Sequence, residues 1–129
     1  MRKISTPDAP TPKGHYSQAI VHGGVVYVAG QLAIDPSDPD AEPGDAGAQT
    51  RLIFKNIAAI LDAAGSSLDR LLQVTIYVTD VSAWGAVNEA FAEALGDHRP
   101  TRAIVPVGPL NRGRDVEVVA IAAVDERRQ

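Results

Sequence analysis

Residues 115–124 constrain the fold more than any other part of the sequence, because they form a predicted strand that is apolar on both faces. Two alternating sets of side chains make up the stretch: Val118, Ala120 and Ala122 on one face, and Val119, Ile121 and Ala123 on the other. A strand of this kind is usually buried on both sides. The fold must therefore provide a cover for each face of this strand.

Two predicted helices are available as that cover. In residues 46–64 and 81–95, apolar side chains recur three or four positions apart, which is typical of an amphipathic helix. The first stripe comprises Ile53, Ile57, Ile60, Leu61 and Ala64, and the second comprises Trp84, Val87, Phe91, Ala94 and Leu95. Gly65 and Gly96 stand where C-terminal caps belong, and Asp80 is a suitable N-cap for the second helix.

Four further segments are predicted strands: residues 17–21, 25–33, 71–79 and 102–107. A tight hairpin turn is indicated at residues 22–24, an extended segment at residues 1–14, and a loop at residues 35–47. The order is therefore β-β-α-β-α-β-β. Two helices can cover only one face of such a sheet, so we expect a single two-layer α+β domain spanning residues 1–129, with another subunit covering the second face.

Composition excludes several classes of function. The net charge is −4 and the sequence contains no long basic run, so nucleic acid is a poor candidate for a partner. The absence of Cys rules out disulfides and thiol ligands, and the three His residues lack metal-ligand spacing, so no metal site is expected. Because no apolar run approaches the roughly 20 residues of a membrane span and the N-terminus lacks a signal-peptide core, we expect a cytoplasmic protein without a membrane partner.

Two charged residues interrupt apolar strands and are the best candidates for a site. Arg102 begins an otherwise apolar strand, and Glu117 lies between Val116 and Val118. Such a charge costs energy unless it is paired or used. One interpretation is a structural salt bridge, between the two or to other charges. The other is a small anion site, in which Arg102 holds a carboxylate with both arms of its guanidinium and Glu117 activates a water.

Several motifs, taken together in their order, resemble the RidA family over roughly residues 7–124. Residues 14–19 resemble the family motif G-P-Y-S-Q-A, with His15 where Pro is usual, and residues 29–36 resemble S-G-Q-I-x-x-D-P. The first helix, the strand at residues 74–80 and the segments at residues 99–102 and 116–118 also match, as does Asn88.

The resemblance implies a chorismate-mutase-like α+β fold with a mixed sheet, assembled as a homotrimer with its sites in clefts between subunits. It also implies hydrolysis of reactive 2-imino and 2-enamino acids to 2-oxo acids and ammonia without a cofactor. By the same resemblance, Arg102 grips the substrate carboxylate and Glu117 lies near the reacting carbon. The residues expected around that cleft are Tyr16, Gly30, Asn88 and Ile104, the last replacing the usual Cys while keeping its backbone N–H.

Other functions are compatible with the same residues. The chain could be a non-catalytic sensor of a small carboxylate, or it could act on a larger enamine such as 2-aminomuconate. An endoribonuclease, an older label of the family, is disfavoured by the acidic charge balance. Individual residues also have ordinary structural interpretations: His15 as turn surface, Tyr16 as an aromatic at the edge of the core, and Gly30 as a site of close backbone packing.

Overall fold

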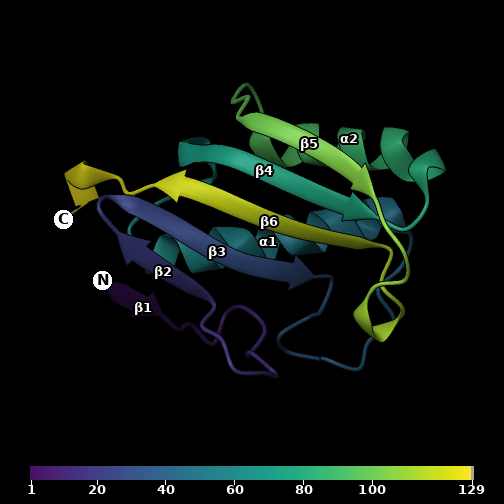
Figure 1. Ribbon diagram of the computed structural model, residues 1–129, viewed down its shortest axis with the longest axis horizontal. Coiled ribbons are helices and arrows are strands. Elements are labelled where there is room, and N and C mark those ends of the chain that lie inside the picture. Colours follow the sequence, from purple (N-terminus) through teal and green to yellow (C-terminus); the bar gives the residue numbers. More distant parts are fainter. Residues whose placement is uncertain (129) are drawn as a thin grey trace.

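Six strands form one mixed sheet in the computed structural model, which describes residues 1–128 (Figure 1). In chain order the strands are β1 Arg2–Ile4, β2 Ala19–His22, β3 Val25–Leu32, β4 Leu71–Val78, β5 Thr101–Pro106 and β6 Val116–Ala123. Across the sheet their order is β1-β2-β3-β6-β4-β5. Only the β4–β5 pair is parallel among these strands. This parallel pair requires a crossover, which the second helix provides.

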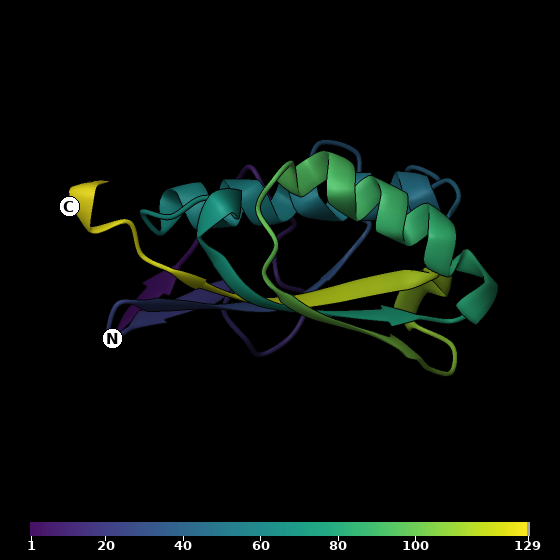
Figure 2. The same cartoon turned by 90° about the horizontal axis from the view of Figure 1, so that it is seen from above.

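Both helices, α1 Ala46–Ala63 and α2 Trp84–Leu95, pack on the same side of the sheet (Figure 2). The predicted stripe of α1 is confirmed, since its side chains at Ile53, Ile57, Ile60 and Leu61 have no solvent exposure. They meet a layer of equally buried sheet residues, among them Val74 and Val118. The two-layer α+β prediction is therefore confirmed. Within residues 1–128, neither helix combines the length and the apolar character that a bilayer span requires.

The predicted hairpin between β2 and β3 is confirmed, and its turn explains the two glycines. Gly23 and Gly24 have φ angles of 58° and 78°. Two consecutive positive φ values define the type I′ turn, whose twist matches that of the flanking strands. Glycine adopts this conformation without the steric cost that a side chain would add.

The structure differs from the sequence-based expectations at two places. The N-terminal segment includes a short strand, β1, which pairs antiparallel with β2 and buries Ile4. Three residues are too few to show an alternating pattern, so periodicity missed it. The second helix begins three residues late, after a 3₁₀ turn at Val81–Ala83, and Trp84 is 45% exposed although it was assigned to the apolar stripe.

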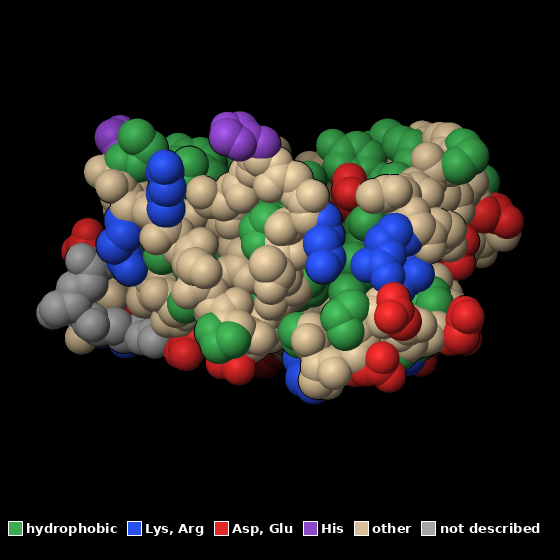
Figure 3. Space-filling model, turned by 90° about the horizontal axis from the view of Figure 1, so that it is seen from below, with side chains coloured by type: hydrophobic (Ala, Val, Ile, Leu, Met, Phe, Trp, Pro, Cys, Tyr) green, Lys and Arg blue, Asp and Glu red, His purple; other side chains and the backbone are tan. Residues whose placement is uncertain are grey.

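The face of the sheet that points away from the helices is called the open face here. On β6 it carries Glu117, Val119, Ile121 and Ala123, which alternate with fully covered residues on the helix side. Tyr27, beside Ile121 on β3, is 48% exposed there. In Figure 3 the open face lies along the upper edge, where hydrophobic side chains gather. The doubly apolar strand is thus confirmed, and the second subunit over its open face stays a prediction.

Candidate functional site

Arg102 lies on the helix side of the sheet, at its β5 edge. It is in register with the buried Val74 of β4, and side chains in register on neighbouring strands point to the same face. Its Nη1 donates a hydrogen bond of 2.7 Å to Oδ1 of Asn88. Its Cζ lies 4.9 Å from the ring centroid of Phe91 and 5.5 Å from that of Trp84. The guanidinium is therefore held by cation–π contacts and one hydrogen bond, all from α2.

The helical repeat explains why α2 can surround this arginine. Trp84, Asn88 and Phe91 are spaced four and three residues apart, which places them on one face of the helix. Sequence reasoning found Asn88 only through the resemblance and assigned the two aromatic residues to the core stripe. The structure adds them to the surroundings of Arg102. A hollow of about 520 Å³ opens beside Arg102, Asn88 and Phe91, so ligands can reach the guanidinium.

Ile104 follows Arg102 by two residues and shares its face. It is in register with the buried Ile76 and packs partly buried against the core. Its side chain therefore contributes to packing beneath α2. We name Arg102, Asn88 and Ile104 the arginine half-site.

Glu117 lies on the opposite face of the sheet. It is in register with Leu32 of β3 and Tyr77 of β4, on the open face. A Cβ atom added to Gly30 would come within 3.3 Å of the Glu117 Cδ and 3.4–3.5 Å of its carboxylate oxygens. Such contacts are tight, so glycine at position 30 leaves the room that the carboxylate occupies. A register shift between Val28 and Gln31 accompanies this approach.

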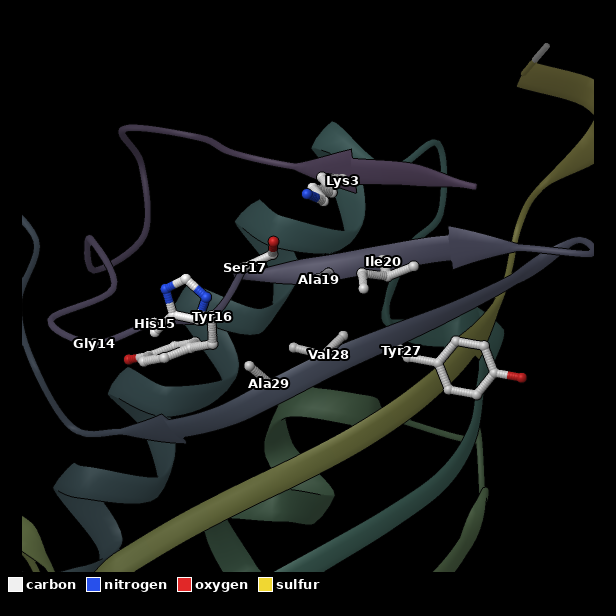
Figure 4. A pocket seen from close by; sticks show the side chains of 10 residues that line it. All are labelled: Lys3, Gly14, His15, Tyr16, Ser17, Ala19, Ile20, Tyr27, Val28 and Ala29. Atoms are coloured by element: carbon white, nitrogen blue, oxygen red, sulfur yellow. The ribbon is translucent and has the colours of Figure 1, made fainter.

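Tyr16 lies on the segment that leads into β2, and its side chain is exposed. The ring packs beside Gly14, where an added Cβ would meet it at 3.4 Å. It lines a hollow of about 640 Å³ together with His15 and Tyr27 (Figure 4). Figure 4 shows the two tyrosines at opposite ends of that hollow, with His15 next to Tyr16. Tyr16 and Gly30 also line a second, smaller hollow together. We name Tyr16, Gly30 and Glu117 the glutamate half-site.

One chain therefore holds two half-sites on opposite faces of one sheet. The salt-bridge interpretation is wrong for residues 1–128, because no ion pair there includes Arg102 or Glu117. The physical reason is that their strands present them to different sides of the sheet. Within the same residues, no group of three or more His, Asp or Glu is arranged to hold a metal. Within one chain, the sheet therefore keeps the guanidinium of Arg102 and the carboxylate of Glu117 on separate faces.

A capped turn positions the start of α2. Asp80 accepts a hydrogen bond of 2.9 Å from the backbone N–H of Ser82. Hydrogen bonds from the backbone and side chain of Ser82 lower the pKa of Asp80 below its ordinary value of 3.8. The ionised cap therefore stabilises the turn that leads to Trp84 and Asn88.

Comparison with known proteins agrees with the fold. Residues 6–124 match the family model described as endoribonuclease L-PSP. A RutC family protein of Pyrococcus horikoshii is 43% identical, covering 92% of this chain and 94% of its own length. The 2-iminobutanoate/2-iminopropanoate deaminase of Rattus norvegicus is 35% identical, and the match covers 92% of this chain and 87% of the rat protein. RidA from an Antarctic Psychrobacter, whose crystal structure is known, is 38% identical in sequence. Its structure superposes with a TM-score of 0.92 over 96% of this chain and 100% of that chain.

Proposed function

Since the chain belongs to the RidA family, we propose that it hydrolyses reactive 2-imino and 2-enamino acids to 2-oxo acids and ammonia, at a cleft shared between two copies of itself. The rat relative named as such a deaminase supports this reaction at the level of the family. The observation that carries the proposal is the separation of Arg102 and Glu117 by the sheet. Asn88 holds the guanidinium of Arg102, Gly30 leaves room for the carboxylate of Glu117, and neither charge takes part in an ion pair within residues 1–128.

The arginine half-site binds the substrate. A guanidinium offers two parallel N–H groups that match the two oxygens of a carboxylate. Asn88 accepts a hydrogen bond from Nη1 of Arg102, and the ring of Phe91 lies near its Cζ. The guanidinium is therefore already oriented before the ligand binds. A guanidinium that is already oriented loses less conformational freedom on binding, which favours affinity.

The glutamate half-site of the neighbouring copy performs the hydrolysis. Glu117 takes a proton from water as the water oxygen bonds to the imine carbon, and passes that proton to the imine nitrogen. The resulting carbinolamine collapses when its hydroxyl proton returns through Glu117 to the nitrogen. The C–N bond then breaks, which releases ammonia and leaves the 2-oxo acid. An imine carbon is already electrophilic, so positioning and proton transfer supply most of what is needed.

The same proposal assigns a role to the open face. Val119, Ile121 and Tyr27 lie on it with no cover from either helix. Apolar surface of this kind is stabilised by burial at an interface. We propose that three copies pack through these faces as a homotrimer, which brings the edge strand β5 of one copy toward the glutamate half-site of the next.

The test combines turnover with binding. Wild type should release 2-oxo acid from 2-iminopropanoate, Glu117→Gln should lose this activity, and Glu93→Gln, on the outer surface of α2, should keep it. Arg102→Lys should weaken binding of a 2-oxo acid by about one to two decades, because a charge-assisted hydrogen bond worth roughly 1.5–3 kcal/mol is lost. Binding of 2-oxo acids without turnover by wild type would replace the enzyme with a carboxylate sensor.

A further inference from the structure

A small hollow adjoins the glutamate half-site and is not used by the proposed reaction. Three separated segments line it: residues 10–18, the end of β3, and the turn at Asn111–Gly113. Tyr16 and Gly30 belong to its lining. Its volume is about 80 Å³, and one water occupies roughly 10–15 Å³. The hollow can thus hold a small polar group.

The charge of this hollow is positive. Lys13 and Arg112 line it, and no Asp or Glu is among its lining residues. Arg112 donates one hydrogen bond of 2.9 Å from Nη2 to the carbonyl of Pro39 and lies 3.7 Å from Oδ1 of Asp40. The side chain of Asp40 is 99% exposed, so water screens that attraction and the positive charge largely persists.

A buried arginine, Arg114, holds the turn that carries Arg112. Arg112 has a φ of 60° and a ψ of 24°, a left-handed conformation that is uncommon for residues other than glycine. Arg114 is only 8% exposed and donates hydrogen bonds of 3.0 Å to the carbonyl oxygens of Arg112 and Ala33. These bonds tie the turn to the end of β3. A strained residue that is held by buried contacts is typical of functional sites.

We propose that this hollow binds a second carboxylate of the substrate, so that the preferred substrates are 2-imino or 2-enamino dicarboxylic acids. The inference rests on the proposed function. A side chain at position 30 would meet the carboxyl group of Glu117, and Gly30 also lines the hollow. A substrate whose reacting carbon lies at Glu117 therefore extends its far end past Gly30 toward Lys13 and Arg112. Cationic side chains stabilise a carboxylate there by charge-assisted hydrogen bonds.

The experiment compares two imines of similar length, generated in situ by an amino-acid oxidase. Glutamate yields an imine with a terminal carboxylate, and methionine yields one with a neutral end. Wild type should show the higher kcat/KM for the dicarboxylic imine. Lys13→Gln and Arg112→Asn should each lower that value about tenfold while leaving the neutral imine unchanged. Asn is chosen at position 112 because it tolerates the left-handed conformation.

Controls separate this inference from the proposed function. Lys55→Gln removes a charge from the exposed side of α1 and should change neither rate. Equal rates for the two imines in wild type, or equal losses for both in the variants, would overturn the inference while leaving the deaminase intact. If no imine is hydrolysed, the proposed function fails, and calorimetry with 2-oxoglutarate still decides: tenfold weaker binding in both variants supports the hollow, and unchanged binding refutes it.

Discussion

Mixing two inactive variants should restore activity, if Arg102 and Glu117 act from different copies. Arg102→Met keeps an apolar stem near Phe91 but removes the charge, and Glu117→Gln keeps the size but removes the proton acceptor. Each variant assembles without a complete site, because every cleft lacks one of the two groups. In a mixed assembly, a cleft is complete wherever an intact Arg102 faces an intact Glu117 on the neighbouring copy.

The expected magnitude follows from the placement of the two residues on opposite faces of the sheet. In a random equal mixture, half of the copies bring an intact Arg102 and half an intact Glu117. About a quarter of the clefts in a symmetric assembly are then complete, so about a quarter of wild-type turnover returns. This fraction does not depend on whether the assembly has two, three or more copies. A site made within one chain would give no recovery, since every chain lacks one group.

The assay is 2-oxo acid release after the two variants have been unfolded together and refolded. Either variant refolded alone provides the background. A matched control mixes wild type with the double variant in equal amounts: shared clefts predict about a quarter of the turnover, whereas sites within single chains predict about half. Recovery at background level, together with half activity in the matched control, would refute the shared cleft.

Three further predictions concern single positions. Gly30→Ala should lower kcat, because the new Cβ meets the Glu117 carboxyl group at 3.3–3.5 Å; an unchanged kcat would show that the carboxylate has room to move. Ile57→Ala should lower the free energy of unfolding in urea by about 2–5 kcal/mol, because it opens a cavity in a fully buried stripe; a loss well below 1 kcal/mol would contradict this packing. Asp80→Ala should lower Tm at neutral pH, because the pKa of Asp80 is lower in the folded chain than its ordinary value of 3.8. The stabilisation is therefore complete above that ordinary value and disappears as pH falls through the folded pKa, so melting curves of the two proteins should converge in acid.

Periodicity predicted the layers because burial in this fold follows the repeats of helix and strand. The stripe of α1 and the alternation of β4 and β6 are both realised. The prediction that Trp84 is part of the core was wrong. An apolar stripe shows which face of a helix is apolar, but it does not show which part of that face extends beyond the edge of the sheet. Here the first turn of α2 extends over Arg102, and the indole contacts a cation there.

The candidate site was predictable only in part. The charges of Arg102 and Glu117 are conspicuous in apolar strands, so the sequence identified both residues. Their placement on opposite faces depends on the register of β4 with β5 and with β6, which is a property of long-range pairing. The basic hollow near Gly30 was missed for the same reason, since Lys13 and Arg112 are distant along the chain and are brought together only by the sheet.

Because the sheet separates Arg102 from Glu117, we expect the free chain and the assembled chain to differ in activity. Under the proposed function, a newly made chain has all the groups that the reaction needs and yet is inert until it meets another copy. Turnover then rises more steeply than in proportion to the amount of chain while assembly is incomplete, by mass action. A substitution on the open face that prevents this assembly would therefore abolish the reaction even when it lies far from either half-site.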